Sequence, residues 1–420
     1  MRVLFVTYPE KTIFQYLVPL AWALRTAGHD VRVASQPQFA DVITQAGLTA
    51  VRVGGDRDIW RVAQRRPAEA EASRAGLPEP YDAAEEPEKA HWDRLRKGYE
   101  TQVAWWHRMK NVPMIAQLVS YARLWRPDLV VWEPTSYAGS IAAKAIGAAH
   151  ARLMYCLDIY GVTRQHYVRL TRLQPAGDRA DPLAEWLGAY ATRYGTTFTE
   201  DMVTGQLTID QLPESMRITA DIEYAAMRFV PYGGPATIPR WLRTPAGRPR
   251  VALTLGLTAT ERFNGYTVDV QDILDAVADL DLEFVATLTD RTKQGLRRIP
   301  ANTRIVPYVP LNDLAATCTA VIHHAGAATL ATATLHALPQ LSIPFHFDQP
   351  ALARKLTEQG AGLDIHSAQV TGQAVRRSLL RLLDEPDFRR KARELRTEML
   401  DMPPPNEIVP RLEELAVAQR

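Results

Sequence analysis

The sequence predicts an α/β protein of two domains, each built on a parallel sheet covered by helices. Its 420 residues exceed the roughly 250–300 at which one hydrophobic core stops growing. Short apolar runs alternate with stretches of helical spacing in both halves, which is typical of repeated strand–helix–strand units. A stretch dense in Pro and Gly, residues 233–249, separates the two halves and is expected to be a linker.

The first half opens on a short apolar run, Val3–Val6, which suits a buried parallel strand. A helix follows, with apolar residues at helical spacing up to Leu24, and Gly28 ends it. The alternation of strand and helix patterns becomes less regular over residues 56–110. We expect this segment to form a helical insertion over the sheet edge. Further elements of this half are expected as strands at 31–34, 50–53, 128–132 and 151–155 and as helices at 39–46 and 136–146.

The second half repeats this alternation. Strands are expected at 251–255, 283–288, 303–306 and 319–322, and a helix at 268–278. We therefore place an N-terminal domain at 1–232 and a C-terminal domain at 250–402. Three prolines begin the segment 403–420, whose helical pattern is expected to cross back onto the first domain.

Composition narrows the function class. The formal net charge of +2 is too small to indicate nucleic acid or an anionic membrane as a partner. The N-terminal apolar run is shorter than the about 7–15 residues of a signal-peptide core, and no stretch approaches the roughly 18 of a spanning helix. The two distant cysteines suit a reducing compartment. A cytoplasmic location is expected.

The most informative stretch begins where an apolar strand ends at Ile322. The loop after it carries His323 and His324, then small residues, and a helix is expected to begin near Thr329. The free N–H groups of a helix N-terminus bind phosphate well, and small side chains let an anion approach the backbone. Gly/Ala-rich turns also occur in domains that bind nothing. The two histidines have no third ligand at a spacing that suggests a metal.

A second strand-to-loop junction lies about twenty residues later and ends in Asp348 and Gln349. Their side chains can accept from and donate to sugar hydroxyls. Ahead of the His pair, the backbone around Val309 can hydrogen-bond a pyrimidine. Contacts to a base, a diphosphate and a sugar would then follow in chain order, at the carboxyl ends of strands where open α/β sheets bind ligands.

Four segments of this chain resemble the donor-binding motif of family 1 GT-B glycosyltransferases. They are Val309-Pro310, His324 through Thr329, Pro339-Gln340 and Asp348-Gln349. Antibiotic deoxysugar transferases of actinobacteria, in the macrolide and anthracycline aminodeoxysugar branch, are similar in further segments. These are 17–25 with Ala27-Gly28-His29, Trp125-Arg126-Pro127-Asp128 with Trp132-Glu133-Pro134, and 211–215. The resemblance covers essentially the whole chain.

The resemblance implies two Rossmann-like domains facing across a cleft, with the acceptor bound by the first and the donor by the second. It implies transfer from a dTDP-deoxysugar with inversion, and neither a metal nor another cofactor. A small polyketide or other natural-product aglycone is the expected acceptor. A cytochrome P450-like helper protein and a homodimer are partners that it leaves open.

By the same resemblance, the site residues fall into two sets. The acceptor-binding residues are expected to be Thr12, Ile13 and Tyr137. The donor-binding residues are expected to be Thr258, Val309, His324, Gly326, Ala327, Ala328, Thr329, Asp348 and Gln349.

Two positions depart from the family pattern. Ala328 stands where the family usually has glycine, which tightens the phosphate loop. Ile13 aligns with the histidine that normally removes the acceptor proton, and isoleucine cannot do this.

Three carboxylates at or just after strand ends are candidates for the missing base. Asp158 is the first choice, and Glu133 and Glu10 follow. Asp158 has an alternative role as a helix cap, which Asp favours. Without the histidine, transfer to an aromatic hydroxyl or to carbon (C-glycosylation) becomes more plausible. A phenol or a carbon nucleophile needs less activation by a base than an alcohol does.

Two other functions stay open. A non-catalytic sugar-nucleotide-binding helper would fit Ile13 but has no need of Asp348 and Gln349. A nucleotide-sugar 2-epimerase on the same fold would turn over the donor without an acceptor.

Overall fold

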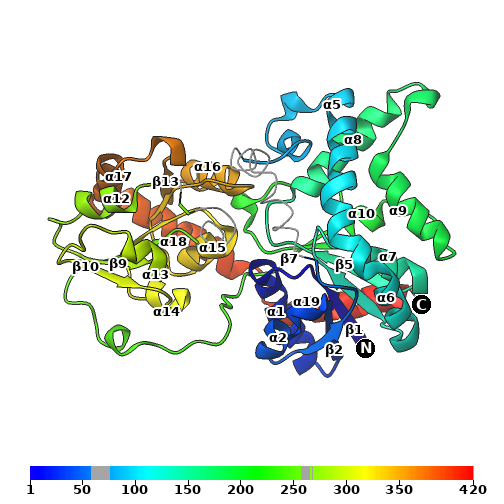
Figure 1. Cartoon of the computed structure of the whole chain (residues 1–420), viewed down its shortest axis with the longest axis horizontal. Helices are drawn as coiled ribbons and strands as arrows, with labels where there is room; N and C mark the ends of the chain where they lie inside the picture. The colour runs from blue at the N-terminus through cyan, green and yellow to red at the C-terminus, as the bar shows by residue number, and fades with distance from the viewer. Residues whose placement is uncertain (58–75, 257–264, 267, 420) are drawn as a thin grey trace.

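The computed structural model describes residues 1–57, 76–256, 265–266 and 268–419. Two parallel sheets lie side by side, each covered by helices on both faces (Figure 1). The sheet of the first domain has the order β3-β2-β1-β4-β5-β6-β7. Its strands are β1 (Arg2–Val6), β2 (Asp30–Ser35), β3 (Thr49–Arg52), β4 (Leu129–Trp132), β5 (Ala149–Leu153), β6 (Leu207–Asp210) and β7 (Tyr224–Ala226).

The sheet of the second domain has the order β10-β9-β8-β11-β12-β13. Its strands are β8 (Arg250–Thr254), β9 (Glu283–Thr287), β10 (Thr303–Val306), β11 (Ala320–His323), β12 (Gln340–Ser342) and β13 (Gly362–Asp364). The central strands β4 and β11 are buried along their whole length, as expected when helices cover both faces of a parallel sheet. The predicted α/β fold is confirmed.

Helices connect the strands in each domain. In the first domain they are α1 (Lys11–Thr26), α2 (Ala40–Gln45), α5 (Trp92–Gln102), α6 (Arg108–Trp125), α7 (Ala138–Ile146), α8 (Ile159–Arg172), α9 (Pro182–Arg193) and α10 (Asp201–Thr204). In the second they are α12 (Val270–Ala276), α13 (Asp290–Gln294), α14 (Leu311–Ala315), α15 (Ala327–Leu335), α16 (Gln349–Gln359) and α17 (Gly372–Asp384).

Both sheets reverse their strand order at an interior pair, β1 with β4 in the first and β8 with β11 in the second. The connections leave such a pair in opposite directions, so a crevice opens at the carboxyl ends of its strands. Glu10 and Glu133 follow β1 and β4, and His324 follows β11. The topology alone therefore brings three predicted site residues to crevice positions.

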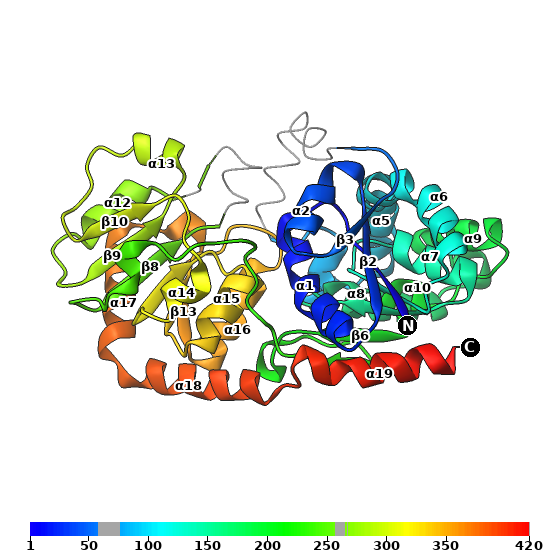
Figure 2. The same cartoon turned by 90° about the horizontal axis from the view of Figure 1, so that it is seen from below.

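The chain ends in two helices that run along both domains (Figure 2). Helix α18 (Pro386–Asp401) lies on the second domain, and α19 (Pro405–Ala418) packs against α1 and β5 of the first. His29 Nε2 lies 2.9 Å from Glu413 Oε1, and this contact joins α19 to the N-terminal domain. The domain boundaries stay a prediction. Within the described ranges, every helix is too short or too polar to span a membrane.

Candidate active site between the two domains

The first face of the site is the loop after β11, which is built around the His324 ring. A Cβ atom added to Gly256 would come within 2.7 Å of this ring, and one added to Gly326 would also overlap it. The two glycines therefore leave room for the imidazole on either side. Burial lowers the pKa of His324 to about 4, and contact with the Thr254 backbone offsets this only in part. The ring is neutral at pH 7 and can donate one N–H.

The neighbouring His323 has a different role. It is fully buried, its Nδ1 accepts from the N–H of Ala325 at 2.8 Å, and its Nε2 lies 2.8 Å from Gln340 Oε1. These bonds hold Ala325 in a left-handed conformation with φ of 61°, which costs energy for a residue with a Cβ. His323 therefore shapes the loop and does not face a ligand.

Helix α15 begins directly after this loop, with Gly326 as its N-cap. Gly326 has no side chain with which to cap this first turn. The N–H groups of that turn carry positive partial charge and suit an anion. Ala328 and Thr329 are half-buried in this turn, so the predicted diphosphate residues lie beside His324.

The second face is the N-terminus of α16. Asp348 is 6% exposed, and its Oδ2 accepts from the N–H of Leu157 in the first domain at 3.1 Å. Burial raises the pKa of this carboxyl group to about 7. Gln349 Oε1 accepts from the Phe345 N–H at 3.2 Å. The predicted sugar-binding pair therefore lies at the interface between the domains.

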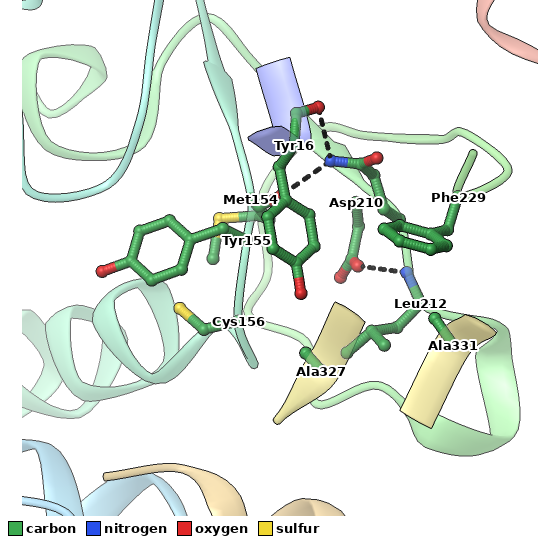
Figure 3. A pocket seen from close by; sticks show the side chains of 10 residues that line it. Tyr16, Met154, Tyr155, Cys156, Asp210, Leu212, Phe229, Ala327 and Ala331 are labelled. Carbon is green, nitrogen blue, oxygen red and sulfur yellow. Dashed lines mark hydrogen bonds between the residues drawn. The ribbon is translucent and has the colours of Figure 1, made fainter. Parts of the chain in front are cut away.

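A small pocket opens at the same interface, close to the first turn of α15 (Figure 3). Its walls come from the first domain on one side and from Ala327 and Ala331 of α15 on the other. The first-domain residues are Tyr16, Met154, Tyr155, Cys156, Asp210, Gln211, Leu212 and Phe229. Burial raises the pKa of Asp210 to about 7.

The surroundings of Asp158, the first choice of base, favour a structural role for its carboxylate. Its carboxylate is fully buried and caps α8 by accepting from the Gly161 N–H at 2.8 Å. It also accepts from Arg152 Nη2 and from the Tyr224 hydroxyl, each at 2.6 Å. Both oxygens are therefore bound inside the first domain, and the fold fixes the orientation of the Asp158 side chain.

Glu133 is also fully buried and saturated with hydrogen bonds. It accepts from the N–H of Thr135 at 2.7 Å, from the hydroxyls of Thr135 and Ser136, and from the N–H of Tyr8 at 3.4 Å. These bonds tie the loop after β4 to the loop after β1. The geometry assigns Glu133 to holding the crevice in shape.

Glu10 lies immediately before α1, the helix that carries Ile13. Its Oε1 accepts from the Thr12 hydroxyl at 3.0 Å, and its backbone carbonyl accepts from the Ile13 N–H at 3.2 Å. Glu10 as a whole residue is buried, with 8% of its surface exposed. Of the three candidate carboxylates, it is the one within a helical turn of Ile13.

The other predicted residues differ in their surroundings. Tyr137 is 1% exposed, and its ring packs at 5.0 Å from His107 and 5.9 Å from Trp186. Tyr137 therefore lies inside a cluster of packed aromatic side chains and not at the surface of that cluster. Val309 is buried in the core of the second domain. Thr258 lies outside the described residues.

Two residues near the crevice were missed by the sequence analysis. Lys110 is half-buried on α6, directly after a π-helical turn (Val103–His107). Its Nζ lies 3.4 Å from the Thr135 hydroxyl and 5.3 Å from the centre of the Tyr8 ring, and burial lowers its pKa. Tyr16 reaches the pocket from α1. Neither stands in a recognisable motif, because tertiary packing alone brings them there.

Family models for the erythromycin biosynthesis protein CIII-like N-terminal and C-terminal domains match residues 22–256 and 271–415. The chain is 45% identical to 10-deoxymethynolide desosaminyltransferase of Streptomyces venezuelae, over 100% of this chain and 98% of that protein. It is 42% identical to aclacinomycin-T 2-deoxy-L-fucose transferase of Streptomyces galilaeus, over 100% and 97%.

Solved structures agree with these relatives. The glycosyltransferase VinC in complex with dTDP is 37% identical, with a TM-score of 0.90 over 100% of both chains. The spinosyn forosaminyltransferase SpnP is 38% identical, with a TM-score of 0.83 over 99% of both. The predicted pair of facing Rossmann-like domains is confirmed. The chain belongs to the erythromycin biosynthesis protein CIII-like family of GT-B glycosyltransferases, which act in antibiotic biosynthesis.

Proposed function

We propose that this glycosyltransferase moves a deoxysugar from a dTDP-sugar to a polyketide-type aglycone, with inversion at the anomeric carbon and without a metal ion. The observation that carries the proposal is the His324 ring, which lies against Gly256 and Gly326 beside the first turn of α15, where the N-cap glycine supplies no capping side chain. The VinC structure, described as a complex with dTDP, supports the nucleotide. The relatives named for desosamine and 2-deoxy-L-fucose transfer support the sugar class.

The donor would be held along the carboxyl edge of the second sheet. The N–H groups of the first turn of α15 and the His324 N–H would donate to the diphosphate, and the Thr329 hydroxyl would add a further donor. Asp348 and Gln349 would bind the sugar hydroxyls after Asp348 exchanges its present bond with Leu157. The backbone at Val309 would bind the pyrimidine.

Glu10 is the residue that we propose as base. It would take the proton of the acceptor hydroxyl as that oxygen attacks the anomeric carbon. The bond between this carbon and the diphosphate oxygen breaks on the opposite face, and dTDP leaves with the electron pair. A single displacement of this kind inverts the anomeric centre. An aromatic acceptor or C-glycosylation stays an alternative, since such nucleophiles are easier to activate.

The test is a transfer assay with purified protein, dTDP-deoxysugars and macrolide or anthracycline aglycones, with products identified by mass spectrometry. A glycosylated aglycone is the expected product. Donor turnover without acceptor would instead favour the 2-epimerase, and dTDP-sugar binding without turnover would favour the non-catalytic helper. The P450-like helper and the homodimer remain predictions. Adding a helper protein to the transfer assay tests the first, and measuring the mass of the protein in solution tests the second.

Replacing His324 with Ala is expected to weaken dTDP binding by about 1.5–3 kcal/mol, because a hydrogen bond to a charged group is lost. Calorimetry on the folded variant measures this. His366→Ala is the control, since His366 is an exposed residue of the same domain. Equal dTDP affinities for wild type and His324→Ala would remove His324 from the diphosphate site.

Transfer is expected to survive an excess of EDTA, because helix N–H groups and the His324 donor would meet the diphosphate charge. Among the described residues, no group of three or more His, Cys, Asp or Glu is placed to hold a metal ion. Initial rates with and without chelator check this. A rate that falls on chelation and returns with Mg²⁺ or Mn²⁺ would contradict it.

A further inference from the structure

We propose that Tyr16, a residue of the acceptor domain, binds the donor's diphosphate across the interface between the domains. This inference rests on the proposed dTDP-sugar donor. It adds a contact from the opposite domain to a site otherwise built from the second domain. Tyr16 lies one helical turn after Ile13 on α1, so the contact would also link donor binding to the helix that faces the acceptor.

The Tyr16 side chain reaches the first turn of α15. It is 7% exposed and lines the pocket together with Ala327 and Ala331. In Figure 3 its hydroxyl points into the pocket, whereas the Tyr155 hydroxyl points away. The Tyr16 oxygen is within hydrogen-bonding reach of the Ala328 N–H, one of the groups expected to hold a phosphate oxygen.

The chemistry of a phenol suits this position. Burial, with the nearby Asp348 and Cys156, raises the pKa of Tyr16 well above its usual value, so the hydroxyl keeps its proton. The nearby Ala328 N–H offsets this rise in part. Once a phosphate oxygen takes that N–H, the Tyr16 hydroxyl is free to donate its own proton to the same phosphate.

Neighbouring rings fix the Tyr16 side chain in place. The ring of Phe229 lies 5.6 Å away and that of Tyr155 lies 6.4 Å away, centre to centre. A buried ring packed in this way cannot swing far from α15 when a ligand arrives. The hydroxyl would therefore meet an incoming diphosphate rather than leave the site.

A second group in the same pocket also points to a polar occupant. Asp210 is 1% exposed, and within the described residues its Oδ2 has no hydrogen-bond partner. A buried oxygen without a partner costs free energy unless something fills the position. Burial raises the pKa of Asp210 to about 7, so its protonated form, which can donate to a phosphate oxygen, is populated at neutral pH.

The experiment compares Tyr16→Phe with wild type by calorimetry, using dTDP and thymidine as separate ligands. The variant removes one oxygen and keeps the ring. We expect dTDP affinity to fall about ten- to a hundredfold, with thymidine affinity unchanged because thymidine has no phosphate. Tyr155→Phe is the matched control. Tyr155 lines the same pocket, but its hydroxyl points away from α15.

Each outcome separates this inference from the donor proposal. If wild type binds dTDP more tightly than thymidine, and Tyr16→Phe binds dTDP as tightly as wild type does, only the role of Tyr16 is overturned. Tighter dTDP binding by Tyr16→Phe would mean that Tyr16 blocks the site, which also overturns it. If wild type itself gains nothing from the diphosphate, the dTDP-sugar donor is wrong and the inference fails with it. Equal losses in Tyr16→Phe and Tyr155→Phe would overturn a specific role of the Tyr16 hydroxyl.

Discussion

Glu10→Gln is expected to lower the rate of sugar transfer by about 10²- to 10⁴-fold, the usual contribution of a general base. Glutamine keeps the size of the side chain and can still accept from Thr12, so the start of α1 should hold its shape. Initial rates at saturating donor and acceptor measure the effect. The affinity for dTDP should change by less than about threefold, because the donor is bound by the other domain.

Glu100→Gln is the matched control, since it makes the same change on an exposed face of the same domain. A near-normal rate for Glu10→Gln would reject Glu10 and return attention to Glu133. Ile13→His provides a further check in the Glu10→Gln background. If an imidazole at position 13 restores transfer to an alcohol, the crevice is intact and only the base had been removed.

Asp158→Asn is expected to lower the free energy of unfolding by about 3–5 kcal/mol, the usual cost of removing one partner of a buried ion pair. Asparagine can still cap α8, but the guanidinium of Arg152 would lose its carboxylate in a fully buried position. The bond from the Tyr224 hydroxyl would weaken as well. Urea unfolding followed by circular dichroism measures the change.

Asp178→Asn is the control, because Asp178 is exposed and the substitution is the same. It should change stability by less than about 0.5 kcal/mol. An Asp158→Asn variant as stable as wild type, but inactive in transfer, would contradict the structural role and make Asp158 the base again.

The sequence by itself determined the positions where chemistry is expected. The apolar runs Val3–Val6 and 319–322, with the loops after them, were enough to predict parallel strands ending at a crevice. The apolar run of a buried strand and the start of a helix are local properties, set by neighbouring residues. The phosphate-type loop from His324 to Thr329 was recognisable for the same reason. The weak point was residues 156–230, where the short strands β6 and β7 gave too little pattern to be assigned.

Only the tertiary structure showed how the surroundings of the three candidate carboxylates differ. Asp158, Glu133 and Glu10 look alike in sequence, since each stands at or after a strand end. What separates them are partners distant in the chain, such as Tyr224 on Asp158 and Tyr8 on Glu133. A hydrogen bond between residues tens of positions apart depends on how strands pair and helices pack, which local spacing does not encode. The same reason hid Tyr16, whose place at α15 exists only because the two domains meet there.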